Sequence, residues 1–238
     1  MFRAGTFARA LRVDHGRHFR LKYVHPGHTG GIRSKDEAEH WLARGVAELA
    51  GRQERLYAQD RWAVLIILQA MDAAGKDGII KHVMSGVNPQ GCQVFSFKTP
   101  SAEELDHDFM WRTTKRLPER GRIGIFNRSY DEETLVVRVP PKFFAKEKVP
   151  PPLIGRHVWK ERFEDICAFE RYLTRNGVAI RKFLLHLSRN EQRKRLFARL
   201  VVASAIVDTL DELKLALPKA DARRRRELQA ARRYLERS

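Results

Sequence analysis

The segment from residue 62 to residue 83 constrains the fold of this chain more than any other. Residues 62–68 form a short, unbroken apolar run rich in β-branched side chains, which is typical of a parallel strand buried on both faces. A glycine-containing loop and an amphipathic helix follow directly. Similar runs occur at residues 92–97, 123–126 and 183–187, with room for crossover helices between them. The sequence therefore predicts an α/β fold, a three-layer sandwich with a mainly parallel sheet.

The loop after the first predicted strand has the composition of a phosphate-binding loop. In the common pattern GxxxxGK[ST], backbone N–H groups and the helix dipole hold phosphate oxygens while the lysine neutralises them. Lys76 stands at that lysine, but Ala70 replaces the first glycine and Asp77 replaces the hydroxyl that holds magnesium. These departures weigh against an ordinary ATPase or GTPase. Asp72 provides a carboxylate that can bind magnesium or orient an acceptor oxygen, and a plain glycine-rich turn is the alternative.

A second group of polar side chains follows the predicted strand at residues 123–126. In an open α/β sheet, ligands bind beyond the carboxyl ends of the strands. Arg128 is suited to clamp a phosphate with two hydrogen bonds. Asn127, Asp131 and Glu132 offer oxygen atoms to a metal ion or to an acceptor. For Asp131, an equally good interpretation is an acidic residue that complements a helix N-terminus.

The charge balance points to a polyanionic partner. Lys and Arg number 46 against 29 Asp and Glu, which gives a formal net charge of +17. Such a surface concentrates polyanions, and composition alone favours nucleic acid, although nucleotides, polyphosphate and anionic lipid also qualify. Hydrophobic residues make up 43% of the chain, which excludes wholesale disorder. The motifs must therefore identify the anion.

The cysteines and the apolar runs indicate a compartment. Cys92 and Cys167 lie far apart and form no CxxC pair, which excludes a disulfide framework and a cysteine zinc site. A reducing, cytoplasmic location fits them. The longest apolar stretch, residues 62–71, is much shorter than the roughly 20 residues of a membrane helix. We therefore expect no membrane span.

Charge and hydrophobic patterning divide the chain into three parts. Residues 1–30 are predicted to be a basic N-terminal arm, with an organellar transit peptide as the alternative. Residues 31–217 form the main domain, and residues 218–238 form an Arg-rich helical tail. Within the main domain, a helix is expected to begin after the N-cap residue Ser34, with Glu37 as its capping-box partner.

A second long helix is expected over residues 157–176, ended by Gly177. Arg162 in this helix is assigned to a ladder of charges spaced four residues apart, and a contact with phosphate is the alternative.

Taken together, the two polar segments resemble the polyphosphate kinase 2 family. The phosphate loop of that family reads GxDxxGKxG and stands here at residues 70–78, with alanine in place of the first glycine. The second family motif, (D/N)RSxY, begins here at residues 127–130. Residues 81–91 and 101–109 also resemble the branch that phosphorylates nucleoside mono- and diphosphates. The similarity extends from about residue 19 to residue 210.

The resemblance implies phosphoryl transfer from inorganic polyphosphate to an adenine nucleotide, AMP or ADP, with magnesium as the cofactor. It also implies a thymidylate-kinase-like P-loop kinase fold that assembles into dimers or tetramers. The excess of positive charge suits a polyanionic donor, so nucleic acid is not expected as a partner. In-line transfer requires positioned charges rather than a nucleophile, and the sequence offers no evident nucleophile.

By this resemblance, each role falls on particular residues. The catalytic residues are Asp72, Lys76 and Arg128. Magnesium is expected at Asp72 and Asn127. The acceptor side comprises Asn127, Tyr130, Asp131 and Glu132. The phosphate-binding groups are expected to be Ala73, Ala74, Gly75, Lys76, Asp77, Gly78, Lys81 and Arg128.

The chain departs from the family pattern in two places. The family commonly has a second aromatic residue where Asp131 stands and a histidine where Pro140 stands, so the acceptor side has changed. The larger departure is at Leu200, which joins Val201 directly, without the several dozen residues that form the family's lid and last core strand. Loss of a lid impairs closure over the phosphates, and loss of a strand exposes a sheet edge.

What remains of the approach to the lid is a basic helix face with Arg193, Arg195 and Arg199, for which a solvated face is an equally good interpretation. The shortened chain predicts weak activity, low stability, or a sheet that a partner subunit closes. Two alternatives to an active kinase follow. One is a non-catalytic polyanion-binding protein, and the other is a lapsed subunit that assembles with an intact relative.

Overall fold

The computed structural model divides the chain into two units, residues 1–189 and 190–238. It describes residues 11–29 and 31–188 of the first unit and residues 190–191 of the second. Several predictions therefore lie outside the described residues: the lid remnant Arg193, Arg195 and Arg199, the Leu200–Val201 junction, and the Arg-rich tail.

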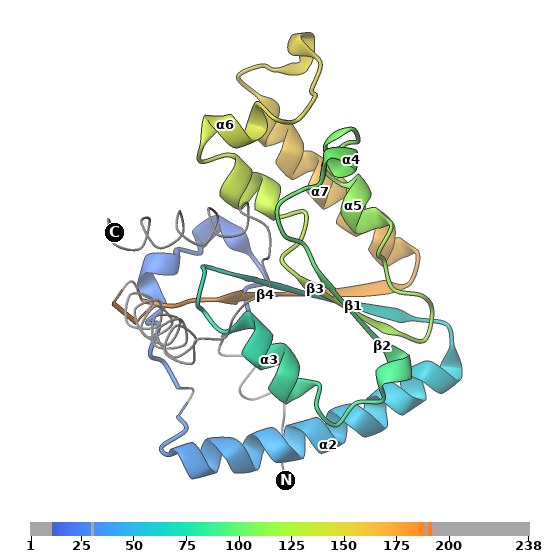
Figure 1. The fold of residues 1–238 in the computed structure, drawn as a ribbon. Coiled ribbons are helices and arrows are strands. Elements are labelled where there is room, and N and C mark those ends of the chain that lie inside the picture. Colours follow the sequence, from blue (N-terminus) through green and yellow to red (C-terminus); the bar gives the residue numbers. More distant parts are fainter. Residues whose placement is uncertain (1–10, 30, 189, 192–238) are drawn as a thin grey trace, which may run out of the picture. The chain divides into compact units, whose positions relative to one another are not determined.

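A parallel sheet of four strands forms the centre of the first unit (Figure 1). The strands are β1 (Ala63–Ala70), β2 (Cys92–Ser96), β3 (Ile123–Asn127) and β4 (Val178–Leu185), and their order is β2-β3-β1-β4. Every pairing is parallel, and Val64 of β1 lies opposite both Ile123 and Ala179. The predicted α/β class and parallel sheet are confirmed, and β1 is a central strand.

The fourth strand begins five residues earlier than the predicted start at residue 183, since β4 starts at Val178. Gly177 has a φ of 78°, in the left-handed region that glycine adopts readily, so the chain turns straight from helix into strand. The residues from 181 to 184 are exposed. Arg181 and Lys182 interrupt the apolar run between Ile180 and Phe183, which is why the sequence concealed the first residues of this strand.

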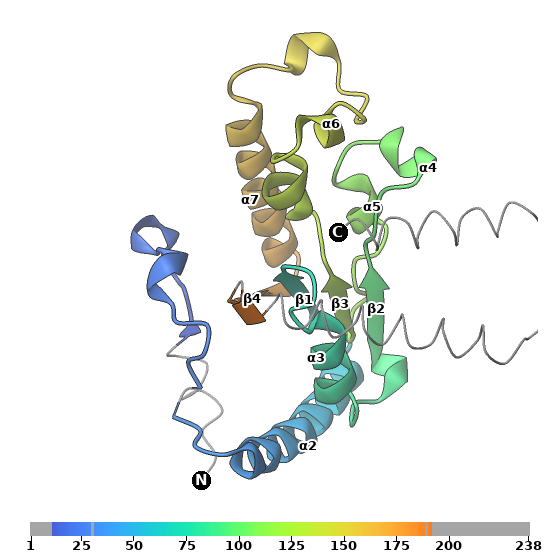
Figure 2. The ribbon, with the colours of Figure 1, turned by 60° about the vertical axis from the view of Figure 1, so that its left-hand side comes forward.

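Helices cover both faces of the sheet (Figures 1 and 2). The helices α2 (Lys35–Gln59) and α3 (Lys76–Val83) lie against one face, and α7 (Val158–Arg175) lies against the other. Three short helices stand on the same side as α7 in both views: α4 (Ala102–Leu105), α5 (Trp111–Thr114) and α6 (Pro141–Phe144). A π-helical turn at Glu133–Val137 follows β3. The predicted three-layer sandwich is therefore present.

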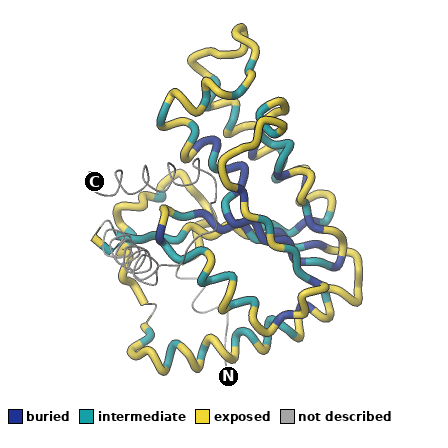
Figure 3. The backbone as a smooth tube through the Cα atoms, viewed as in Figure 1, coloured by how far each residue is buried: buried dark blue, intermediate teal, exposed yellow. Residues whose placement is uncertain are grey.

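Side chains of β1 point alternately to the two faces of the sheet and pack in two separate hydrophobic clusters, as the period of two in a strand requires. Leu65 and Ile67 are fully buried on the α7 side, where they join Ile166 and Leu173 of α7 in one cluster. Leu68 belongs to the other cluster, with Leu56 of α2 and Ile79 and Ile80 of α3 packed against it. Figure 3 shows the buried residues concentrated in the strands between these layers.

The long helices begin and end as the sequence indicates. The Oγ atom of Ser34 accepts a hydrogen bond from the backbone N–H of Glu37 at 3.1 Å, which confirms the N-cap. The capping box is incomplete, because the Glu37 carboxylate accepts from the N–H of Arg33 at 2.9 Å instead of that of Ser34. Helix α7 ends at the expected Asn176-Gly177 pair. Among the described residues, none forms a helix with the length and apolarity needed to cross a bilayer.

Candidate active site

The loop between β1 and α3 is a tight turn held partly in left-handed conformations. Gly75 has a φ of 97° and is the N-cap of α3, where its carbonyl accepts from the N–H of Ile79 at 3.0 Å. Ala73 has a φ of 65°, a conformation that costs about 1–2 kcal/mol for a residue with a Cβ. Such strain persists only where the surroundings impose it, and it gathers at functional sites. The turn brings the N-terminus of α3 to the carboxyl end of β1.

Lys76 lies at the start of α3 with its ammonium turned back over the loop. Its Nζ atom donates to the carbonyl oxygen of Ala70 at 3.0 Å, and no other described residue accepts a hydrogen bond from it. Burial lowers the pKa of Lys76, and the nearby Arg128 lowers it further, while the carboxylates of Asp72, Glu132 and Asp77 oppose the shift. One neutral acceptor leaves donor capacity for an anion, since an ammonium carries three N–H groups.

Arg128 reaches from the end of β3 to the phosphate loop. Its Nη2 atom donates to Oδ1 of Asp72 at 2.7 Å, and its Nη1 atom donates to Oε2 of Glu132 at 3.2 Å. Glu132 is fixed in turn by Gln69, whose Nε2 atom donates to the other carboxylate oxygen at 2.9 Å. Arg128 itself has a φ of 69°, so a second strained residue lies in this site. The structure thus brings together the three predicted catalytic residues, Asp72, Lys76 and Arg128.

Asp77 and Asn127, the residues at the positions linked with magnesium, contact each other directly. The Nδ2 atom of Asn127 donates to Oδ1 of Asp77 at 2.6 Å, which ties the end of β3 to the first turn of α3. Asp72 is engaged separately, by Arg128. The predicted ligands Asp72 and Asn127 are therefore held by different partners.

The donor set around the loop suits magnesium rather than a transition metal. Asp72, Asp77 and Asn127 can each offer a side-chain oxygen atom to a cation. Magnesium in phosphoryl-transfer sites takes one or two protein carboxylates and completes its shell with water and substrate phosphates. The residues present therefore fit that ion.

The remaining predicted phosphate-binding groups differ in their surroundings. The N–H of Ala74 is used inside the loop, where it donates to the carbonyl oxygen of Met71 at 3.3 Å. Gly78 lies in the first turn of α3, and a Cβ placed there would meet no atom within 4 Å. The space next to the Gly78 Cα atom is therefore open, and an anion can approach the backbone only where such space exists. Lys81 is exposed one turn further along α3.

Tyr130 and Asp131, expected on the acceptor side, are buried, and their side chains bond to residues of α7 and β4. Tyr130 is 2% exposed, and its hydroxyl donates to Oε1 of Glu170 at 2.9 Å. Lys182 of β4 donates to Oδ1 of Asp131 and to Oε1 of Glu170, each at 2.7 Å. The sequence patterns gave no sign of Lys182 or Glu170, because neither lies near a motif and only the fold brings them to the turn.

The ionisation of this group follows from its burial. Burial, together with the charges of Glu170 and Asp131, raises the pKa of Tyr130, so the phenol stays protonated and donates. Burial also raises the pKa of Asp131, against the opposing charge of Lys182. Although burial lowers the pKa of Lys182, Asp131 and Glu170 together raise it above its ordinary value. The ammonium is therefore fully charged near neutrality.

A cavity of about 300 Å³ opens beside Arg128 on the α7 side of the sheet. Aromatic side chains line it, among them Phe97, Phe109 and Phe143, together with several charged groups. Arg112 is one of these: it lies 5.1 Å from the ring centre of Phe97 and donates to a backbone carbonyl at 2.7 Å. Sequence reasoning missed Arg112, because it lies in the four-residue helix α5, which is too short for a periodic pattern.

Two acidic residues that line this cavity, Glu133 and Glu147, pair with Arg162 of α7. Arg162 lies 3.4 Å from Glu133 and 3.2 Å from Glu147, and its guanidinium is 4.2 Å from the ring centre of Phe109. The predicted charge ladder is therefore wrong for Arg162, which pairs with other elements instead of with its own helix. Burial and the neighbouring Glu147 raise the pKa of Glu133 to about 8, against the opposing effect of Arg162.

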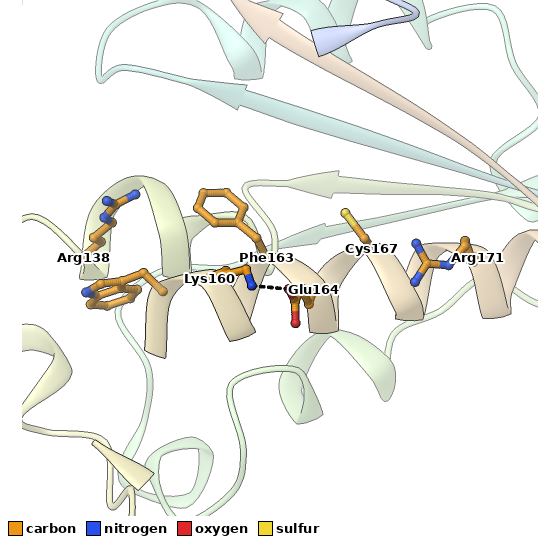
Figure 4. Close-up of a pocket in the computed structure, with 7 residues that line it drawn as sticks. Arg138, Lys160, Phe163, Glu164, Cys167 and Arg171 are labelled. Atoms are coloured by element: carbon orange, nitrogen blue, oxygen red, sulfur yellow. Dashed lines mark ion pairs between the residues drawn. The ribbon is translucent and has the colours of Figure 1, made fainter. Parts of the chain in front are cut away.

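A second hollow, of about 410 Å³, lies along one face of α7 (Figure 4). Basic and aromatic side chains line it, including Arg138, Phe163 and Arg171. The ladder expected on this helix is found here, between Lys160 and Glu164 at 3.5 Å. None of the predicted site residues lines this hollow. The carboxyl ends of β1 and β3 therefore remain the candidate active site.

Comparison with known proteins gives consistent matches. Residues 32–204 match the family model of polyphosphate kinase 2 (PPK2). The chain is 58% identical over 168 residues to an ADP-polyphosphate phosphotransferase of Rhodopseudomonas palustris, covering 70% of this chain and 58% of that protein. It is 44% identical over 193 residues to an AMP/ADP-polyphosphate phosphotransferase of Meiothermus ruber, covering 79% of this chain and 67% of that protein.

The fold is also similar to a solved structure, that of polyphosphate kinase 2 from Arthrobacter aurescens TC1. The TM-score is 0.71 at 39% sequence identity, and the match covers 81% of this chain and 65% of that chain. The chain thus spans only 58% to 67% of the length of these three relatives.

Proposed function

The chain belongs to the polyphosphate kinase 2 family, and on that basis we propose that it transfers a phosphoryl group from inorganic polyphosphate to AMP, ADP or both. The observation that carries the proposal is the contact of Arg128 with Asp72, which lies in the loop that Lys76 follows. Two cations and a carboxylate from separate strand ends converge there. Such convergence suits a donor with many phosphate groups.

Each residue has a role that its chemistry supports. Lys76 and Arg128 neutralise the transferred phosphoryl group and its neighbours, because charge on the non-bridging oxygens must be balanced as the bond to the donor breaks. Asp72 holds Arg128 in place before substrate binds and orients the acceptor oxygen. The open space at Gly78 and the N-terminus of α3 accommodate further donor phosphates.

Magnesium is the cofactor we propose, with Asp72 as one ligand and Asn127 or Asp77 close by. When held by these residues, the ion would supply positive charge that balances the charge of the phosphate groups during transfer. The side-chain oxygen atoms of these residues support this assignment, since oxygen is the ligand that magnesium prefers.

The acceptor nucleotide is assigned to the cavity beside Arg128. Its aromatic walls suit the apolar faces of a nucleoside, while Arg128 and Glu132 stand at the end where phosphate must lie. Asn127 lies at the same strand end. Tyr130 and Asp131, which are buried, would serve this site by supporting the turn that carries Arg128.

We further propose a cytoplasmic homo-oligomer, a dimer or a tetramer. The two thiols, Cys92 and Cys167, are free, which suits a reducing compartment. The oligomer rests on family membership.

The test is chromatographic analysis of nucleotides after the purified chain is mixed with polyphosphate, magnesium and either AMP or ADP. ADP or ATP should form with the parent chain and should be lost in Lys76→Ala. Lys35→Ala is the matched control, because Lys35 is an exposed lysine on α2 whose only described ion pair is with Glu39. Folded protein that binds polyphosphate but yields no product would contradict the proposal and would instead support a binding protein or a lapsed subunit.

A further inference from the structure

Lys182 stands on the edge strand β4, and its side chain, 39% exposed, lies against acidic residues of two other elements. Lys182 lies opposite Ile67 of β1, and Ile67 lies opposite Phe126 of β3, so the three share the face that packs on α7. On that face the ammonium lies 2.7 Å from a carboxylate oxygen of Asp131 and 2.7 Å from one of Glu170. It is also 5.5 Å from the ring centre of Tyr130. A single cation thus joins β4, α7 and the turn after β3.

The charges of this group make the lysine necessary for its arrangement. Asp131 and Glu170 are carboxylates whose side chains are 13% and 25% exposed, and both accept from the same ammonium. The remaining described partners are hydroxyls: Ser129 donates to Asp131 at 3.2 Å, and Tyr130 donates to Glu170 at 2.9 Å. Without Lys182, two poorly hydrated negative charges would repel each other on either side of Tyr130.

The turn held by this group is the one that carries Arg128. Asp131 follows Arg128 by three residues, and its backbone N–H donates to Oγ of Ser129 at 3.0 Å. Arg128 has a φ of 69°, a strained conformation for a residue with a side chain. Strain of this kind needs support from the surroundings. Buried hydrogen bonds at both ends of the Ser129–Asp131 segment provide that support.

We propose that Lys182 is a positioning residue, which acts through Asp131 and Tyr130 to hold Arg128 in reach of the phosphate loop. This inference rests on the proposed phosphoryl transfer at that loop. Lys182 touches neither Asp72 nor Lys76, so its effect on the reaction passes through the turn. A loss of the ammonium lets the turn relax, and Arg128 then spends less time at the position where transferred charge develops.

The kinetic test combines Lys182→Met with Arg128→Lys. In the parent chain, Lys182→Met should lower kcat by about 10-fold to 100-fold, the effect expected of a small misplacement, while KM for the nucleotide changes little. In the Arg128→Lys background the same substitution should have at most a small effect, because contributions through a shared partner are not additive. Lys182→Arg, which keeps the charge, should restore much of kcat. Equal losses in both backgrounds, or an unchanged kcat in Lys182→Met, would overturn the proposal.

A second measurement does not need turnover. Hydrogen exchange of the peptide covering residues 127–133 should accelerate in Lys182→Met at a temperature where circular dichroism shows both proteins folded. Asp131→Asn, which removes one charge but keeps the size of the side chain, should act in the same direction and serves if Lys182→Met does not fold. Unchanged exchange in both variants would overturn the proposal. Faster exchange in the variants, together with a parent chain that shows no turnover, would refute the proposed function alone.

Discussion

The Nη2 atom of Arg128 lies 2.7 Å from Oδ1 of Asp72, so the turn after β3 is joined to the loop after β1. The two residues are 56 positions apart, and only the parallel pairing of β1 with β3 brings them together. A bound phosphate would be an alternative partner for the arginine at the same place. The ion pair therefore holds these two side chains of the candidate site in place without a ligand, which would reduce the rearrangement needed for the proposed transfer.

Replacing Arg128 with lysine should lower kcat by about 10²-fold to 10³-fold, the usual cost of one aligned donor at a site of developing charge. Lysine keeps the charge but cannot hold Asp72 and Glu132 together with a planar fork. Initial rates of nucleotide formation at saturating polyphosphate measure the effect. Arg52→Lys on the exposed face of α2 is the matched control, and a similar loss there would refute a specific role for Arg128.

Asp72→Asn should raise the magnesium concentration that gives half-maximal rate. The change removes a hard anionic ligand and also weakens the contact with Arg128. A magnesium titration at fixed polyphosphate and nucleotide, with chelator-treated protein as the blank, gives the result. A rate that falls with no shift in the titration midpoint would mean that Asp72 acts on Arg128 and not on the metal.

Stability should fall as the pH rises from about 5 to 8, because of Glu133. Its pKa is raised from 4.5 to about 8 in the folded protein, so the folded state binds a proton that the unfolded state has released. The stabilisation that the bound proton provides is complete below pH 4.5 and is lost as the pH passes 8. The free energy of unfolding should fall over this range by about 2–4 kcal/mol, after allowance for the coupling to Glu147.

The variant Glu133→Gln carries no titrating group at this position and should show a flatter dependence on pH. Urea unfolding of the parent and the variant at pH 5, 6.5 and 8 makes the comparison. Parallel curves for the two proteins would place the pH dependence elsewhere.

Phe126→Ala should destabilise the first unit by about 3–5 kcal/mol. Phe126 is fully buried in the α7-side core and meets Phe97 edge to face, with ring centres 4.9 Å apart. Truncation leaves a cavity beneath the strand that leads to Arg128. Denaturant unfolding gives the value, and Leu42→Ala on the exposed side of α2 should change it by less than about 1 kcal/mol.

The elements that could be predicted from the sequence are those marked by a pattern of neighbouring residues. Unbroken apolar runs predicted β1 and β3, and the Gly-Lys pair predicted the loop and α3. The start of β4 was hidden, because Arg181 and Lys182 separate residues 178–180 from the apolar run that begins at Phe183. The role of Asp72 was foreseeable from its place in the loop, although the resemblance to a known family, and not spacing alone, marked it as catalytic.

Long-range partners could not be read from the sequence. Lys182 and Glu170 reach Asp131 and Tyr130 only because β4 and α7 pack on one face of the sheet. Arg162 looked like one member of a ladder of surface charges, whereas it lies between Glu133 and Glu147 from other elements. A charged residue on an amphipathic helix has the same local pattern whether it meets solvent or a buried acid.

The central place of β1 in the sheet determines when the candidate active site can form during synthesis. Its neighbours β3 and β4 come much later in the chain, since Val64 pairs with Ile123 and Ala179. Pairing across such separations is slow and leaves strand edges exposed while the chain is still growing. The phosphate loop leaves the ribosome well before Arg128, and Lys182 follows later still. The candidate active site, which needs the ends of both β1 and β3, is therefore complete only after most of the first unit has been synthesised.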